Sequence, residues 1–240
     1  MENEPLIHPI YEQSTHTWTF IISDPKTNQA VILDPVLDFT KTNNSIATSA
    51  ADNLLELVRK QNYTIDRILE THGSSPARSA AWYMRTQLQQ RTGTAPHVVM
   101  GKSFAGVQKL FARKYNIQNI SGRRNLETAF ADGQRLEIGQ LQAYALHLPT
   151  PSQEGHLGYL IGRNVFIGEP GLVAEYDSRK VDFGSEAAHL LWISMQRLLS
   201  LPEDFRVFSS FDSDEKDEGM GRAFMTVAEL RARCKLPTTQ

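Results

Sequence analysis

The chain has 240 residues, of which 40% are hydrophobic and 22% are charged. Such a length and composition are ordinary for a globular protein, and we expect one domain spanning residues 1–240. Lys and Arg together number 25 against 27 for Asp and Glu, a net charge of -2, which argues against nucleic acid or an anionic membrane as the partner.

The cysteine content and the amino-terminal sequence bear on where the protein works. A single cysteine, Cys234, excludes an intrachain disulfide framework and fits a reducing compartment. The first twelve residues, MENEPLIHPIYE, show neither the apolar segment of a signal peptide nor an Arg-rich transit pattern. No apolar run approaches the roughly 20 residues that a membrane helix needs. We therefore expect a cytoplasmic protein.

The first half of the chain predicts a hairpin followed by alternating helices and strands. The turn residues Asp24–Asn28 separate two β-branched, aromatic runs, and a polar loop is expected over 40–49. Proline is common in the first turn of a helix, so Pro76 indicates a helix start. The predicted elements are strands at 17–23, 29–33 and 66–70, and helices at 50–61 and from Pro76 to about Arg91.

The second half continues the alternation. Its strongest helix signal is the apolar face of 185–201, formed by Ala188, Leu191, Trp192, Met195 and Leu198. The predicted elements are helices after Ser103, at 185–201 and at 226–233, and strands at 97–100, 134–138, 141–146, 157–162, 165–168 and 206–209. Strands that alternate with helices in two halves indicate the α/β class.

The stretch Ile68–Ala81, ILETHGSSPARSAA, carries the clearest functional signal. Its apolar strand ends in Glu70-Thr71-His72, and a polar turn precedes the next helix, which carries Ala80, Ala81 and Trp82 inward. A strand that delivers a histidine to a loop before a helix is a common way to build an active site. A histidine in such a place is also often a hydrogen-bonded structural residue, so the stretch alone leaves both interpretations open.

Two further blocks, HPIY at 8–11 and AVILDPVLD at 30–38, accompany ILETH at 68–72. In this order the three blocks resemble the persulfide dioxygenase and glyoxalase II branch of the metallo-β-lactamase superfamily. The resemblance runs from about His8 to about Asp212. It implies an α/β fold, the αββα sandwich of that superfamily, with metal ligands supplied by four loops at one edge of the two sheets.

The first of these loops has lost most of its ligands. In the family it reads Thr-His-x-His-x-Asp-His, and only the first histidine survives here, as His72. The other ligand positions hold Ser74, Pro76 and Ala77. Proline and alanine side chains cannot bind a metal, so the resemblance implies that the second metal position is gone.

The other three loops are altered as well. The family's His-Thr-Pro-Gly-His corresponds to His147–Pro151, with a proline at the ligand position. The third loop keeps a carboxylate, Glu169, one methylene longer than the family's aspartate, and the fourth, Gly-His, reads Ser210-Phe211. Catalytic metal sites use three protein ligands and an open position, whereas only His72 and Glu169 remain. We therefore expect no resident metal and no other cofactor.

The same edge still gathers ionisable groups. A histidine near a carboxylate is a workable acid–base pair, and a cationic side chain can hold an anionic oxygen. The segment YDSRKVDF at 176–183 resembles the family segment that lies beside the substrate. The predicted catalytic residues are His72, Glu169, Asp212 and His147. The predicted substrate-binding residues are Arg78, Lys180, Asp182, Tyr176, Phe211 and Ser74.

The function expected from these residues is a metal-independent enzyme of the lyase, isomerase or cyclase type, with a small molecule as its partner. A homodimer is left open. One alternative is a non-catalytic binding or scaffold protein, and another is a residual mononuclear-iron dioxygenase or thioester hydrolase. Ser74 beside His72 also permits a serine nucleophile near a helix N-terminus, although Gly-Ser-Ser-Pro is equally a helix-capping sequence.

Overall fold

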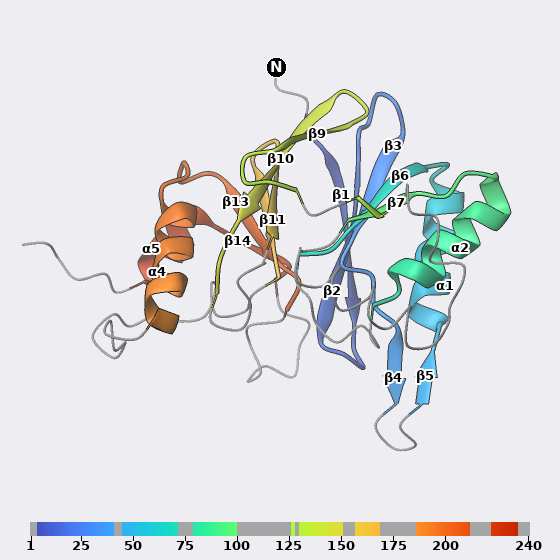
Figure 1. Cartoon of the computed structure of the whole chain (residues 1–240), viewed down its shortest axis with the longest axis horizontal. Coiled ribbons are helices and arrows are strands. Elements are labelled where there is room, and N and C mark those ends of the chain that lie inside the picture. Colours follow the sequence, from blue (N-terminus) through green and yellow to red (C-terminus); the bar gives the residue numbers. More distant parts are fainter. Residues whose placement is uncertain are drawn as a thin grey trace, which may run out of the picture.

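The computed structural model describes residues 4–40, 45–71, 79–99, 126–127, 130–150, 157–168, 186–211 and 222–234. In this part of the chain, two sheets lie face to face between two pairs of helices (Figure 1). The arrangement is the αββα sandwich that the sequence predicts.

The first sheet is antiparallel at one side and parallel at the other. Its described strands, in spatial order, are β1 (Leu6–Glu12), β2 (Thr17–Ser23), β3 (Gln29–Leu33), β6 (Thr64–Leu69), β7 (His97–Val99) and β8 (Leu126–Glu127). The pairs β1–β2 and β2–β3 are antiparallel, whereas β3, β6, β7 and β8 run parallel. The parallel strands therefore end at one edge of this sheet.

The second sheet contains one parallel pair among antiparallel ones. Its described strands, in spatial order, are β14 (Phe224–Thr226), β13 (Arg206–Ser209), β12 (Asn164–Ile167), β11 (Leu157–Ile161), β10 (Leu141–His147) and β9 (Arg135–Ile138). Only β12 and β13 are parallel among these pairs. Like β3 and β6 in the first sheet, they end together.

Three hydrophobic clusters hold the layers together. The central cluster lies between the sheets, where the Phe20, Phe166 and Phe208 rings pack against one another. A second cluster joins the first sheet to α1 (Ser49–Lys60) and α2 (Ala81–Thr92). The third joins the second sheet to α4 (Glu186–Leu199) and α5 (Val227–Arg233). Burying apolar surface on both faces of each sheet is what fixes four layers.

The described structure corrects two sequence predictions. The helix expected from Pro76 begins at Ala81, because Ser79 forms a β-bridge with Val36 and the Ala80 N–H donates to the Pro35 carbonyl. Ala80 and Ala81 are buried as expected, but Trp82 is half-exposed. The polar loop expected over 40–49 contains a strand, β5 (Ser45–Ala47), which pairs with β4 (Asp38–Thr40) in a ribbon that projects from the body (Figure 1).

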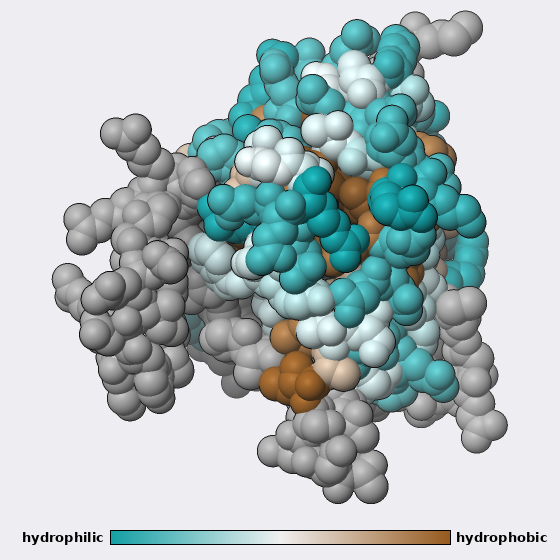
Figure 2. Space-filling view, turned by 90° about the vertical axis from the view of Figure 1, so that its right-hand side faces the viewer, coloured by the Kyte–Doolittle hydropathy of each residue, from teal (hydrophilic) through white to brown (hydrophobic). Residues whose placement is uncertain are grey.

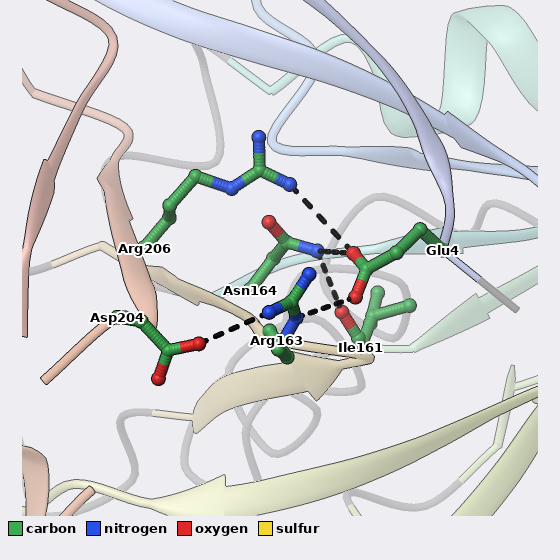
Figure 3. Close-up of polar contacts among 6 residues, drawn as sticks. All are labelled: Glu4, Ile161, Arg163, Asn164, Asp204 and Arg206. Atoms are coloured by element: carbon green, nitrogen blue, oxygen red, sulfur yellow. Dashed lines mark hydrogen bonds and ion pairs between the residues drawn. The ribbon is translucent and has the colours of Figure 1, made fainter. Parts of the chain in front are cut away.

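A cluster of charged side chains ties the start of the chain to the second sheet. Glu4 accepts hydrogen bonds from Arg163 Nε at 2.9 Å and from Asn164 Nδ2 at 3.4 Å, and its Oε2 lies 3.7 Å from Arg206 Nη2 (Figure 3). Asp204 completes the cluster by accepting from Arg163 Nη1 at 3.0 Å. The balance of acids and bases explains why the cluster can form without uncompensated charge.

The face covered by α1 and α2 is mostly hydrophilic, with small hydrophobic areas (Figure 2). Among the described helices, none has the length and apolar character needed to cross a membrane.

Candidate functional site

Three strands from both sheets end at one edge of the sandwich. In the first sheet, β3 leads into Asp34 and β6 leads into Glu70 and Thr71. In the second sheet, β13 leads into Ser210. Each of these four polar residues is at least 95% buried. Buried polar groups require partners, and these residues find them in one another and in nearby backbone.

The Asp34 carboxylate is the centre of this cluster. Its Oδ1 accepts the Thr71 N–H at 2.8 Å, and its Oδ2 accepts the Thr71 hydroxyl at 2.5 Å. Oδ2 also accepts the hydroxyl of Ser210. The backbone of Asp34 is fixed too, since its N–H donates to the Leu69 carbonyl and its own carbonyl accepts the Thr19 hydroxyl, both at 2.9 Å. Its φ of +50° lies in the left-handed region, which Asp tolerates better than most residues.

The backbone of Ser210 contacts two other strands. Its N–H donates to the carbonyl of Ile167, the last residue of β12, at 2.9 Å, and its carbonyl accepts the Trp18 N–H of β2 at 2.8 Å. The next residue, Phe211, forms a β-bridge with Thr17 and is half-buried. The end of β13 is thus bound both to its own sheet and to the opposite one.

Glu70 is buried beside the Asp34 cluster. Its Oε1 accepts the hydroxyl of Ser79, and its backbone carbonyl accepts the Tyr159 hydroxyl at 3.2 Å. Full burial, followed by the nearby charges of Asp34 and Glu70, raises the pKa of Tyr159 well above its ordinary value. The Tyr159 phenol therefore stays protonated at neutral pH and acts as a hydrogen-bond donor.

Two of the predicted site residues lie within the described ranges. His147, the last residue of β10, is exposed and pairs with Leu157, whose N–H donates to the Thr71 carbonyl at 3.1 Å. Phe211 follows Ser210 directly. Both residues therefore belong to the edge that carries the Asp34 cluster. The remaining predicted residues, His72, Ser74, Arg78, Glu169, Tyr176, Lys180, Asp182 and Asp212, lie outside the described residues.

The described side chains do not form a ligand set for a metal ion. The sequence resemblance assigns Phe211 to the family's fourth ligand position, and its ring has no donor atom. The adjacent Ser210 hydroxyl is bound to Asp34. Across the described ranges, no three His, Cys, Asp or Glu side chains are grouped closely enough to hold a metal. His72 and Glu169, the two candidate ligands that the sequence retains, lie outside the described residues.

The cluster contains residues that were not predicted as part of the site. Asp34 and Ser210 lie in sequence segments that resemble the family, but the sequence gives neither of them a role in the site. In the structure they connect the ends of the strands that lead into the predicted loops. One local signal exists, because an aspartate directly after a buried strand and before Pro35 can cap neighbouring backbone groups. Nothing local in the sequence connects Asp34 to a serine 176 residues away.

No family model matches the sequence, but curated proteins do. The Beta-lactamase hydrolase-like protein of Agrobacterium fabrum is 32% identical over 209 residues, covering 87% of this chain and 47% of the relative. The chain spans about half the length of this relative and of two from Xylella fastidiosa with the same name. Glyoxylase B2 of Dictyostelium discoideum is 30% identical over 237 residues, covering 96% of this chain and 78% of the relative.

Solved structures share the architecture. ETHE1 from Myxococcus xanthus matches with a TM-score of 0.65 and 23% identity, covering 95% of this chain and 82% of that chain. A metallo-beta-lactamase from Staphylococcus aureus also matches with a TM-score of 0.65, at 14% identity, covering 97% of this chain and 63% of that chain. With the strand order, the sequence blocks and the match to most of Glyoxylase B2, these likenesses establish that the chain belongs to the metallo-β-lactamase-fold superfamily, in its glyoxalase II-like branch.

Proposed function

We propose that the chain is an enzyme that acts on a small molecule by acid–base chemistry and needs no resident metal ion. Relatives named as a hydrolase-like protein and a glyoxylase support a catalytic role. The observation that carries the metal-free part is Phe211. The sequence resemblance assigns this residue to the position where the family supplies a metal-binding histidine, and in the structure it is half-buried and forms a β-bridge with Thr17.

In this proposal His72 and Glu169 form the acid–base pair, assisted by Asp212 and His147. A histidine beside a carboxylate can have a pKa of about 7, which suits proton transfer at neutral pH. The described residues next to His72, Glu169 and Asp212 in the sequence lie close together, which supports one common site for the three. Thr71 directly precedes His72, Ile167 lies two residues before Glu169, and Ser210 lies two residues before Asp212. The Asp34 carboxylate accepts the hydroxyls of Thr71 and Ser210, and the Ser210 N–H donates to the Ile167 carbonyl.

The substrate would be a small molecule with an apolar part and an anionic or enolisable oxygen. Phe211 offers an apolar wall, and Lys180 or Arg78 would hold the oxygen. Tyr176, Asp182 and Ser74 would complete the surroundings. Chemistry that only moves protons suits a lyase, isomerase or cyclase.

Untargeted mass spectrometry tests the proposal directly. Chelator-treated protein is incubated with a metabolite extract of its source organism, and the extract is compared before and after. We expect a compound to be consumed by the wild type, and the rate to fall on the order of 10²- to 10⁴-fold in His72→Ala, because general acid–base groups contribute about that much. Consumption that appears only after iron or zinc is added would overturn the metal-free proposal.

A scaffold or binding role is the second candidate, and the hydrogen bonds around Asp34 favour it. They hold the edge together whether or not a reaction occurs there. A scaffold predicts that His72→Ala lowers stability without any loss of turnover, since no turnover exists. Unfolding measurements on the variant, run beside the extract assay, separate the two candidates.

The activities of the family's metal enzymes give the first specific prediction. Glyoxalase II and persulfide dioxygenase reactions depend on a bound metal. Because the ligand set is incomplete, we expect S-lactoylglutathione and glutathione persulfide to turn over no faster than in buffer, and purified protein to hold well under one equivalent of zinc or iron. Thioester absorbance, oxygen uptake and elemental analysis measure these quantities. Thioester hydrolysis that resists chelators would instead favour Ser74 as a nucleophile.

A further inference from the structure

The Ser210 hydroxyl joins the two sheets at the site edge by its hydrogen bond to Asp34. Asp34 and Thr71 belong to the ends of first-sheet strands, whereas Ser210 follows β13 of the second sheet. The three residues are between 1% and 3% exposed, so no bulk water replaces a lost bond. A hydroxyl bound to a buried carboxylate is a charge-assisted hydrogen bond, which is stronger than one between neutral groups.

Two backbone hydrogen bonds cross between the sheets on either side of this contact. The Trp18 N–H of the first sheet donates to the Ser210 carbonyl at 2.8 Å, and the Leu157 N–H of the second sheet donates to the Thr71 carbonyl at 3.1 Å. Ser210 and Thr71 are thus each engaged by a backbone bond and by the same Asp34 carboxylate. If the hydrogen bond between Ser210 and Asp34 is lost, we expect the two backbone hydrogen bonds, Trp18 to Ser210 and Leu157 to Thr71, to open more often.

We propose that Ser210 is a positioning residue, whose hydroxyl acts through the Asp34 carboxylate to hold the end of β13 against the end of β6. This inference rests on the proposed function, because a metal-free site needs a protein group to link the loops that a bound metal would otherwise hold together.

Hydrogen exchange of individual amides tests the link. In Ser210→Ala and Ser210→Gly we expect exchange of the Trp18 and Leu157 amides to accelerate roughly tenfold or more, as loss of a hydrogen bond to a charged group implies. The Ser200 amide of the α4 end, which donates to the Gln196 carbonyl, serves as the internal reference. Ser210→Thr retains the hydroxyl and should restore slow exchange at the edge.

Ser194→Ala is the matched control. Ser194 is also fully buried, and its hydroxyl donates to the Pro149 carbonyl at 2.6 Å, so the variant loses a buried hydroxyl hydrogen bond, here to a neutral acceptor, without touching Asp34. In this variant, the exchange rates of the Trp18 and Leu157 amides, divided by that of the Ser200 amide, should be the same as in the wild type. A ratio that is the same in Ser210→Ala, Ser210→Gly and wild type would overturn the proposal. Faster edge exchange in chelator-treated wild type would overturn the metal-free function instead, while the Ser210 variants would still decide the link.

Discussion

The backbone of His147 is held by charged side chains from two other segments. Its N–H donates to Asp132 Oδ1 at 2.9 Å, and its carbonyl accepts Arg197 Nη1 of α4 at 3.1 Å. Arg197 Nη1 also lies 2.8 Å from Asp132 Oδ1. Burial alone would raise the pKa of Asp132, but hydrogen bonds from Arg197 and from the His147 N–H outweigh it and lower the pKa. A residue proposed for catalysis is thus fixed by an ion pair.

Asp132→Asn should therefore change stability in a pH-dependent way. A carboxyl whose pKa is lowered by folding stabilises the protein above its unfolded pKa of about 3.9, and this contribution is lost as the pH falls through the folded pKa. We expect the variant to be about 0.5 kcal/mol less stable near neutral pH, because Asp132 is half-exposed. Urea unfolding should show this difference shrinking below about pH 4. Glu137→Gln, at a more exposed ion pair with Arg135, should change little. A difference that grows in acid would contradict the assignment.

Among the elements, α5 has the most complete start signal. The Thr226 hydroxyl accepts the Glu229 N–H at 3.1 Å, and the Glu229 carboxylate accepts the Thr226 N–H at 2.7 Å. This capping box satisfies two backbone donors that a helix start leaves open. The helix then buries Val227 and Leu230 against the second sheet.

Thr226→Ala should destabilise the protein by about 1 kcal/mol, because it removes the hydroxyl that caps α5. Thermal unfolding followed by circular dichroism measures the change. Thr86→Ala is the control, since the Thr86 hydroxyl donates to the Trp82 carbonyl inside α2 and caps no helix. Equal losses in the two variants would show that the cap has no special contribution.

The local sequence predicts elements well where turn chemistry or periodicity is strong. The hairpin strands Thr17–Ser23 and Gln29–Leu33 match their predicted bounds, because Asp24–Asn28 supplies the turn and both strands are almost wholly buried. The start of α2 was wrong by five residues. There the contacts of Ser79 and Ala80 with Val36 and Pro35 override the helix signal of Pro76. Tertiary contacts of this kind leave no mark within a short stretch of sequence.

The sequence predicted where the candidate site lies better than it predicted which residues contact one another there. The family blocks directed attention to the edge where His147 and Phe211 lie. They did not predict that Asp34 would be shared by Thr71 and Ser210, because 37 and 176 residues separate these pairs. Such contacts depend on how the two sheets pack, which is a property of the whole core.

At the scale of the whole molecule, the sandwich is closed by side-chain and backbone bonds at both ends. The Glu4 cluster joins the start of the chain to the second sheet (Figure 3). The Asp34 cluster joins the two sheets at the site edge. Between them the aromatic core packs Phe20 of the first sheet against Phe166 and Phe208 of the second. Under the proposed metal-free function, these protein groups keep the sheets together without a bound ion.

Thermal unfolding with and without metal should therefore give the same midpoint. An ion that binds only the folded state adds about 4 kcal/mol at a thousandfold excess over its Kd. For a chain of this size, each kcal/mol raises Tm by roughly 2–4 °C, so a true zinc or iron site would raise it by about 8–16 °C. We expect a shift below about 2 °C on adding either ion or a chelator, in the wild type and in His72→Ala alike. A rise of several degrees that saturates at one equivalent and disappears in His72→Ala would show that this edge still binds a metal, because only specific binding to the folded state produces that pattern.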